Sequence, residues 1–255
     1  MSHNAYEEVY SQLTQSSGPV LPVYVYANSE EVLDYTKQNG TNDHIMDAWV
    51  DTMKTFQVGG NIGFVALSRF KHEENDHNYP EVTGSNYNDY DGAFDEWMKD
   101  ENKNGWGDLT QFQGAHLFIH GNGCTVEHAS ASSGGDDAAN NAFNRSIQAW
   151  TGVGCGDDMN EFEVASAIQE PLHTFINYNN STVQDELNNP DEDGNLPEHG
   201  LGEINNGAIT PLLTYHADEG YADMGNCDET GSTNSWTAEL TECTLTAVNA
   251  TAKEA

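Results

Sequence analysis

The sequence NEFEVASAIQEPLHTFINY, from Asn160 to Tyr178, has a helical pattern from which the fold prediction can be built outward. One face of this helix is apolar because four side chains recur at intervals of three and four: Val164, Ile168, Leu172 and Phe175. Asn160 and Glu163 have the spacing of a capping box, which predicts that the helix begins at this point. Pro171 lies inside the helix, where it removes a backbone hydrogen bond and either kinks the helix or costs about 3 kcal/mol.

Apolar runs elsewhere in the chain predict a β-sheet. Residues 20–27 (VLPVYVYA) alternate, and residues 62–70 (IGFVALSRF) form a buried-strand pattern. Further strands are expected at 115–120 and within 142–153, and further helices at 42–56, 92–99 and within 236–250. This order predicts an α/β or α+β fold, with a mixed β-sheet flanked by helices in a single domain over residues 1–255. The acidic segment 179–208 is expected to be a loop-rich insertion.

The charge of the chain is strongly one-sided. It has 42 Asp and Glu against 8 Lys and Arg, which gives a formal net charge of −34 over 255 residues. Such a charge destabilises a compact state by self-repulsion, and molar salt screens the repulsion because it shortens the Debye length to about 3 Å. We therefore expect a halophilic protein that depends on high concentrations of K⁺ or Na⁺. The same charge argues against nucleic acid and anionic membranes as partners.

Two features bear on where the protein acts. The chain has no run of 18 apolar residues, so no transmembrane segment is expected, and its first residues do not resemble a signal peptide. The protein is therefore either cytoplasmic or a mature form whose export signal has been removed. The cysteines favour the second interpretation, an extracellular or cell-surface location.

Four cysteines are present, and none is in a Cys-x-x-Cys pair: Cys124, Cys155, Cys227 and Cys243. An even number of cysteines without zinc-binding spacing predicts disulfides and an oxidising compartment. The simplest pairing is Cys124–Cys155 with Cys227–Cys243, although four cysteines allow three pairings, and four buried thiols are the alternative. Five glycosylation sequons also fit a cell-surface protein: Asn39, Asn144, Asn179, Asn180 and Asn249.

The residues with the most distinctive chemistry are Gln169-Glu170-Pro171-Leu172-His173, inside the predicted helix. Zinc peptidases have His-Glu-x-x-His at such a place, because two histidines four residues apart bind Zn²⁺ and the Glu acts as a general base. Here Gln169 stands where the first histidine would be, and an amide oxygen is a weaker zinc ligand than imidazole. Glu170 and His173 occupy the positions of the base and the second ligand.

The surrounding sequence resembles the metzincin group of zinc peptidases, most nearly the reprolysin-like arrangement. Four segments have this resemblance: Gly114–His120, Glu163–Ile176, Thr210–Tyr215 and 225–248. They resemble, in order, the edge strand before the active-site helix, that helix, the turn beneath the metal, and a Cys-bounded loop leading into the last helix. In the turn beneath the metal, Leu212 stands where the family has Met. The resemblance implies a metzincin-like single domain.

The chain departs from the family at the metal ligands. The resemblance implies Glu170 as base and His173 as ligand, but Gln169 replaces the first ligand, Asn179 the third, and Ile176 a glycine. A substitute ligand could come from His199 or from His216. Glu170 and His173, three residues apart, could also bind a metal themselves.

Two other patterns suggest metal binding. His116 and His120 lie four apart on an expected strand, about 13 Å from each other, so we interpret them as structural or surface residues. Two loops have the oxygen spacing of calcium sites: Asp100, Asn102 and Asn104 before Gly105, and Asn189, Asp191 and Asp193 before Gly194. Both lack the carboxylate at the twelfth position, and an ordinary acidic turn is the alternative for each.

Two functional classes follow from the sequence. The missing ligands favour a non-catalytic halophilic surface protein, which uses the scaffold of a degenerate zinc peptidase to bind a peptide, a glycan or another cell-surface protein, or as a structural component. The alternative is a metal-dependent hydrolase with an altered ligand set, with Glu170 as general base and His173 and His199 as ligands.

Overall fold

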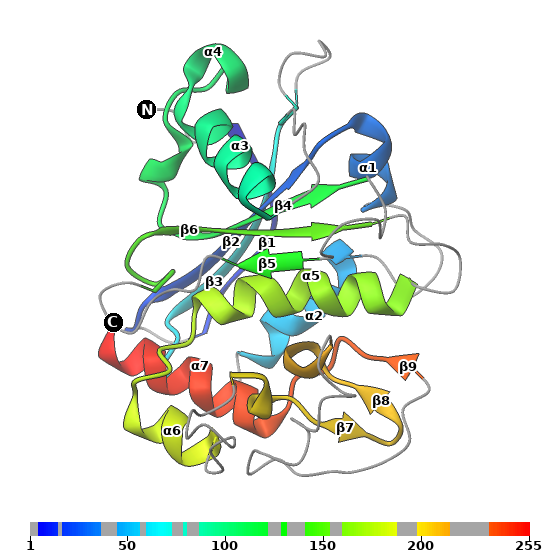
Figure 1. Cartoon of the computed structure of the whole chain (residues 1–255). Coiled ribbons are helices and arrows are strands. Elements are labelled where there is room, and N and C mark those ends of the chain that lie inside the picture. Colours follow the sequence, from blue (N-terminus) through cyan, green and yellow to red (C-terminus); the bar gives the residue numbers. More distant parts are fainter. Residues whose placement is uncertain are drawn as a thin grey trace.

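The computed structural model describes residues 5–14, 17–36, 45–56, 60–72, 79–80, 87–121, 129–131, 141–153, 160–187, 198–214 and 235–255. The main sheet has six strands in the order β1-β3-β2-β4-β6-β5. These are β1 (Tyr6–Leu13), β2 (Val20–Ala27), β3 (Phe64–Phe70), β4 (Gly114–His120), β5 (Ala129–Ala131) and β6 (Ser146–Gly152). The four inner strands are parallel, and β1 and β5 are antiparallel to their neighbours. The predicted mixed sheet flanked by helices is confirmed (Figure 1).

Seven α-helices accompany the strands in the described part of the chain. They are α1 (Glu30–Tyr35), α2 (Ile45–Thr55), α3 (Tyr87–Lys99), α4 (Glu101–Asn104), α5 (Asn160–Thr174), α6 (Ser181–Leu187) and α7 (Glu242–Glu254). Helices α2, α5 and α7 contribute to one apolar core, and α3 contributes to a second, largely aromatic core. Because side chains alternate along a strand, β2 sends Val23 and Val25 into the first core and Tyr26 into the second.

The segment predicted as a loop-rich insertion has regular structure. Residues 179–208 contain α6, the short helix η5 (Glu198–Leu201) and the strand β7 (Ile204–Asn205). Strand β7 forms a three-stranded sheet with β8 (Ala208–Ile209) and β9 (Ser235–Trp236). In the described residues of this segment, 179–187 and 198–208, the loop prediction fails at α6, because Val183 and Leu187, one helical turn apart, are fully buried between the acidic positions.

Several element boundaries differ from those expected. Helix α3 begins at Tyr87, within a polar segment, and α5 ends at Thr174. Helix α7 begins only after Thr241, whose Oγ1 accepts a hydrogen bond from the backbone N–H of Thr244 at 2.8 Å. This N-cap fixes the start of α7, because it satisfies a donor that the first helical turn leaves unpaired.

Helix α5 continues past Pro171 because another residue supplies the missing hydrogen-bond donor. In a regular helix the N–H of residue 171 would bond to the carbonyl oxygen of Ala167, and proline has no N–H. That oxygen instead accepts a hydrogen bond from the indole Nε1 of Trp49, on α2, at 3.1 Å. Both Trp49 and Ala167 are fully buried. The side chain of Asn160, the predicted cap, lies outside the described part.

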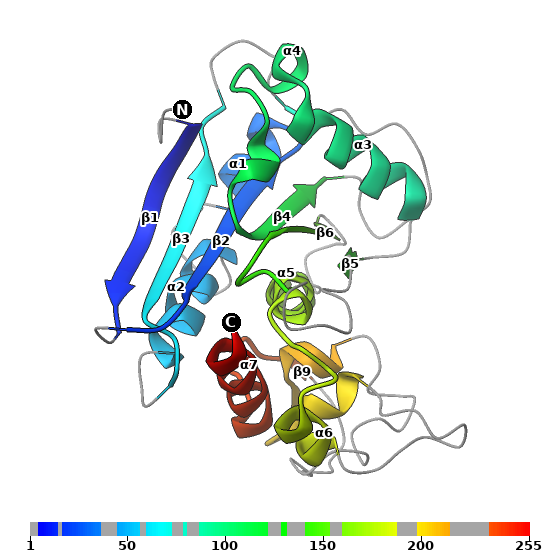
Figure 2. The same ribbon diagram turned by 90° about the vertical axis from the view of Figure 1, so that its left-hand side faces the viewer.

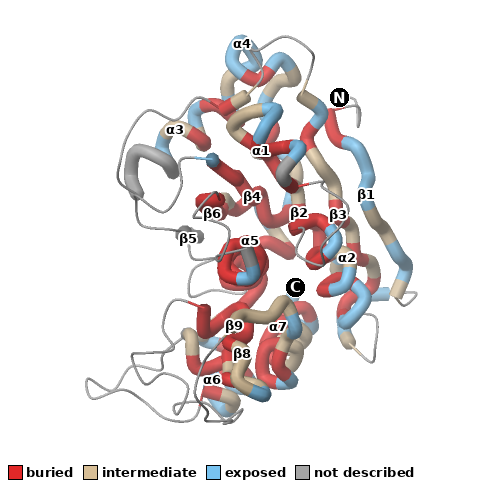
Figure 3. The backbone as a smooth tube through the Cα atoms, turned by 90° about the vertical axis from the view of Figure 1, so that its right-hand side faces the viewer, coloured by how far each residue is buried: buried red, intermediate tan, exposed pale blue. Residues whose placement is uncertain are grey.

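Burial is highest at the centre of the sheet. All seven residues of β4 are buried, and α5 is buried along almost its whole described length, whereas β1 is largely exposed (Figure 3). Within the described residues, no helix has both the length and the apolarity needed to cross a bilayer.

Candidate functional site

The candidate site is built on the C-terminal half of α5, which packs against β4, β5 and β6 and against the short helix η6 (Pro211–Leu213). Gln169 and His173 lie one turn apart on the same face of α5, as expected from their spacing. The Nε2 atoms of the two side chains are 3.4 Å apart. Glu170 precedes His173 by three residues on the same helix.

His199 lies beside His173, although 26 positions separate them in the sequence. Their ring centroids are 5.1 Å apart and the rings are nearly perpendicular, at 82°. His199 comes from η5, which packs against both η6 and α7. The structure therefore brings together Gln169, His173 and His199, three of the residues proposed from the sequence. His216, the other substitute, lies outside the described residues.

Each histidine of this cluster is held through its Nδ1 atom. His199 Nδ1 donates to the backbone carbonyl of Leu212 at 2.9 Å, so its Nε2 has a lone pair. His173 Nδ1 is 2.6 Å from the hydroxyl of Tyr178. Partners of this kind fix the orientation of metal-binding imidazoles in proteins. Tyr178 was not among the residues proposed from the sequence, and its position four residues after the end of α5 is the signal that could have identified it.

The amide of Gln169 has an unsatisfied atom. Gln169 is 1% exposed, and its Oε1 is buried without a hydrogen-bond partner. Such an atom costs about 1–3 kcal/mol. Because the amide oxygen and nitrogen are exchanged by a rotation of the amide, the carbonyl oxygen can take the position 3.4 Å from His173 Nε2. An oxygen there could be a ligand or accept a hydrogen bond from His173.

The spacing of these side chains fits a shared metal ion. For zinc, with Zn–N distances of about 2.0–2.1 Å and tetrahedral angles, neighbouring ligand atoms lie about 3.4 Å apart and two imidazole centroids about 5 Å apart. The corresponding separations are 3.4 Å between Gln169 and His173 and 5.1 Å between the two rings. The described part of the chain has no group of three or more His, Cys, Asp or Glu that could hold a metal. The candidate ligands that the structure brings together are two imidazoles and one amide, those of His173, His199 and Gln169.

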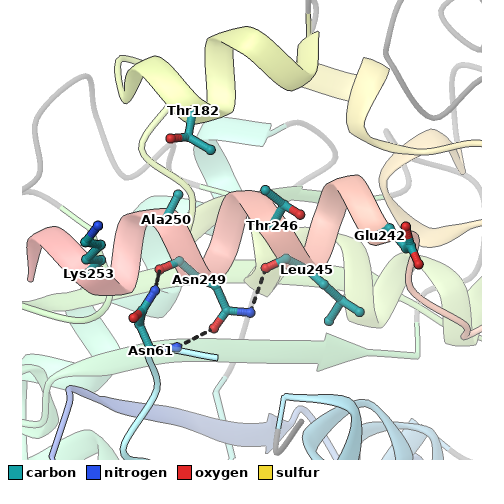
Figure 4. Close-up of a pocket in the computed structure, with 8 residues that line it drawn as sticks. All are labelled: Asn61, Thr182, Glu242, Leu245, Thr246, Asn249, Ala250 and Lys253. Carbon is teal, nitrogen blue, oxygen red and sulfur yellow. Dashed lines mark hydrogen bonds between the residues drawn. The ribbon is translucent and has the colours of Figure 1, made fainter. Parts of the chain in front are cut away.

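Glu170 and His173 are both buried. They are 5% and 6% exposed, so neither side chain lies open to solvent. A groove among the described residues has a volume of about 460 Å³ and runs along α7, between α6 and Asn61 (Figure 4). Helix η6 packs against α5, and η5 packs against η6 and brings the His199 ring to 5.1 Å from the His173 ring.

The two histidines of β4, His116 and His120, are buried inside the fold. His116 is fully buried, its Nε2 donates to the carbonyl of Phe112 at 2.8 Å, and its Nδ1 therefore accepts from the hydroxyl of Tyr26 at 2.7 Å. Tyr26 in turn accepts from the hydroxyl of Tyr6 at 2.6 Å. Burial lowers the pKa of His116 to about 4 and that of His120, which is 1% exposed, to about 4 as well. Both imidazoles are neutral near pH 7.

The first calcium candidate is a capped helical turn. Asp100 Oδ1 accepts the backbone N–H of Asn102 at 2.9 Å and caps α4. Asn104 is fully buried, and its Oδ1 accepts the N–H groups of Trp106 and Gly107 while its Nδ2 donates to three carbonyl oxygens. The Asn104 oxygen is therefore used to hold the turn rather than presented to a cation. The second candidate, Asn189, Asp191 and Asp193, lies outside the described residues.

The predicted modification sites fall into three groups. Asn180 and Asn249 use their side-chain amides to hold the fold: Asn180 Oδ1 accepts from Thr182 N at 2.8 Å, and Asn249 Oδ1 accepts from Asn61 N at 2.9 Å. Asn179 is exposed and Asn144 is partly buried. Asn39 lies outside the described residues.

One of the four cysteines is in the described part. Cys243, at the start of α7, is 3% exposed and is disulfide-bonded. Cys124, Cys155 and Cys227 lie outside the described residues, so the Cys227–Cys243 pairing stays a prediction.

Comparison with known proteins identifies no relative of this chain. No family model, curated protein or solved structure matches the chain. The expectation that Gly114–His120 is an edge strand is wrong, because β4 lies between β2 and β6 and the edge strands of the main sheet are β1 and β5. The continuous burial of β4 is typical of an inner parallel strand.

Proposed function

We propose that this chain is a metal-dependent hydrolase, with Gln169, His173 and His199 as metal ligands and Glu170 as general base. The observation on which this depends is the approach of the His173 and His199 rings to 5.1 Å. Two further observations support it: the Nδ1 contacts that orient both rings, and the unsatisfied Oε1 of Gln169. Zinc is the expected ion, because imidazole nitrogen suits it and a neutral amide oxygen can complete the set.

The proposed reaction is hydrolysis of a peptide or similar amide. A bound divalent ion would supply Lewis acidity toward a carbonyl oxygen. The Glu170 carboxylate would take a proton from the attacking water and return it to the leaving amine as the C–N bond breaks. Tyr178 would hold the His173 ring in place through Nδ1. A metzincin-like arrangement is part of this proposal, and it depends on the sequence resemblance alone.

A metal titration in molar KCl tests the ligand set. Protein treated with a chelator should take up about one equivalent of Zn²⁺, and His173→Ala or His199→Ala should each weaken binding by at least about tenfold. His72→Ala is the matched control and should bind zinc like the wild type, since His72 is half-buried and its ring makes an edge-to-face contact with Phe70 of the second core. Gln169→His should tighten binding, because imidazole replaces an amide.

Hydrolysis is tested separately with Glu170→Gln. This variant should keep its zinc and lose hydrolysis of a protein substrate in molar KCl, since the base is not a ligand. A wild-type protein that binds no zinc in the titration would contradict the whole proposal.

A second candidate is a non-catalytic role, in which the protein binds a peptide, a glycan or a cell-surface protein, or serves as a structural surface component. The low exposure of Glu170 and His173, at 5% and 6%, favours it. In this case Glu170→Gln and His173→Ala should change neither metal content nor any activity. The location expected for both candidates is extracellular or at the cell surface.

A further inference from the structure

Strand β1 forms one edge of the main sheet. Its neighbour on the inner side is β3, and it is the first strand in the sheet order (Figure 2). An edge strand turns every second N–H and C=O away from its neighbour, so it can pair with a strand from another molecule. β1 has eight residues and is largely exposed, which gives it room for such a partner.

Exposed apolar side chains gather at this edge. Among the described residues, the exposed large apolar side chains are Val9, Leu13 and Val20, at 37%, 68% and 44%. Val9 and Leu13 lie on β1. Leu13 and Val20 both pair with Phe64 of β3, one from each side, so they form a row across three strands. Apolar surface of this kind marks a site of association.

A bulge makes β1 complementary to itself. The register with β3 shifts between Glu8 and Tyr10, and Val9 is the extra residue. Glu8 pairs with Ser68 of β3, and Ser11 pairs with Ala66 of β3. Ser68 and Ala66 are two positions apart, so they lie on the same face of the sheet, and their partners Glu8 and Ser11 lie on that face too. Without the bulge, residues 8 and 11 would lie on opposite faces.

We propose that β1 pairs antiparallel with β1 of a second copy of this chain, about a two-fold axis between Val9 and Tyr10. Glu8 then faces Ser11 of the second copy, and Glu7 faces Gln12, so no carboxylate faces another. This matters in a chain with a net charge of −34, because like charges directly opposite destabilise a strand pair.

The same register also pairs the apolar residues. Tyr6 faces Leu13 of the second copy, and Val9 faces Tyr10. The register of β1 on β3 places Tyr6 and Leu13 opposite Phe70 and Phe64, on one face of the sheet, so this pair lies on the side of the second core. Leu13, 68% exposed in the single chain, would be covered in the pair.

Register-specific crosslinking tests the proposal. Glu8→Cys and Ser11→Cys proteins, mixed in equal amounts in molar KCl under mild oxidation, should form a disulfide-linked dimer, and neither should do so alone. The matched control is Glu7→Cys with Ser11→Cys: Glu7 pairs with Arg69 and Ser11 with Ala66, so the two thiols lie on opposite faces and should not crosslink. Non-reducing electrophoresis against the wild-type chain separates new crosslinks from those of the native cysteines.

Sedimentation of the wild-type protein in molar KCl completes the test. A mass of two chains at micromolar concentration, together with the crosslink at 8 and 11, supports the proposal. Monomer mass at every concentration, or equal crosslinking in the control pair, would overturn it. If the Glu8→Cys thiol formed a disulfide with a different protein, the edge would pair with a strand of that protein, and the proposal would be overturned as well.

Discussion

Pro171 and Trp49 show how a residue that breaks a helix can be accommodated inside one. The carbonyl oxygen of Ala167 loses its intrahelical donor at Pro171, and the indole N–H of Trp49 replaces that donor at 3.1 Å. The bond also ties α2 to α5, the helix on which the candidate site is built. The sequence predicts that Pro171 removes a helical hydrogen bond, but not which residue replaces the donor, because Trp49 is 122 positions away along the chain.

Replacing Trp49 should therefore lower the free energy of unfolding by more than the loss of packing alone would. Trp49→Phe leaves the Ala167 oxygen buried without a donor, which we expect to add about 1–3 kcal/mol to the loss of stability. Pro171→Ala restores a backbone N–H at the right place, so Trp49→Phe should cost about 1 kcal/mol less in that background. Denaturant unfolding of the four proteins in molar KCl measures this difference. Equal costs in both backgrounds would show that the indole N–H contributes little.

The buried histidines predict a pH dependence of stability. Burial lowers the pKa of His116 from 6.5 to about 4, so the unfolded chain binds the proton more readily than the folded chain. The stability contributed by this difference is present above pH 6.5 and is lost as the pH falls from 6.5 toward 4. At pH 4 the loss from one such histidine reaches about 3 kcal/mol, and His120 adds a similar effect.

The variant His116→Gln tests this prediction. Its amide can donate to the Phe112 carbonyl and accept from Tyr26, and it has no proton to gain. The variant should lose less stability than the wild type between pH 6.5 and 4, and the remaining slope should include the contribution of His120. Chemical unfolding at several pH values measures the slopes, and parallel slopes for the two proteins would contradict the prediction.

At the scale of elements, α7 is tied to the segment that enters β3. Asn249 Oδ1 accepts from the backbone N–H of Asn61, and the Asn249 carbonyl accepts from the Asn61 side chain at 3.0 Å. A Cβ atom added at Gly60 would lie 2.1 Å from Asn249 Oδ1. The close approach of Gly60 is therefore part of this contact between two distant elements.

Gly60→Ala should push the Asn249 amide away and break its bond to Asn61, at a cost of about 1–2 kcal/mol in the free energy of unfolding. Gly92→Ala is the matched control, since nothing lies within 4 Å of its added Cβ and the residue is inside α3. That change should stabilise the protein by up to about 1 kcal/mol, because alanine is the better helix former. Thermal melts that moved in the same direction for both variants would contradict this interpretation.

Elements with a strong local pattern were predicted from the sequence, and those that depend on distant contacts were not. Strand β2 has the predicted limits, and α2 lies within the helix predicted at 42–56 and buries Trp49 and Met53. The start of α3 and the presence of α6 were missed, because both stretches of sequence are rich in polar residues. In the candidate site, the pairing of Gln169 with His173 follows from helical spacing, whereas the approach of His199 depends on how η5 packs against η6.

For the whole molecule, the charge decides the conditions under which this structure is stable. The four ion pairs described involve Lys54, Arg69, Lys99 and Lys103. Even if all 8 Lys and Arg were paired one to one, 42 − 8 = 34 acidic side chains would have no partner among them. Pairing with Lys and Arg can therefore not remove the repulsion between these carboxylates, and we expect that salt has to screen it.

We therefore expect the melting temperature to fall steeply when KCl is lowered from molar concentrations to about 0.1 M, where the Debye length rises to about 10 Å. A loss of about 4 kcal/mol would lower the melting temperature by about 8–16 °C for a domain of this size. NaCl at equal ionic strength should restore stability as KCl does, because screening depends on ionic charge and concentration. Sucrose is the control: it strengthens apolar burial but screens no charge, so it should restore less. Thermal melts monitored by circular dichroism across the series measure the effect. A melting temperature that stayed constant from molar to 0.1 M salt would mean that the carboxylates are too far apart, or too well hydrated, to limit the stability of the fold.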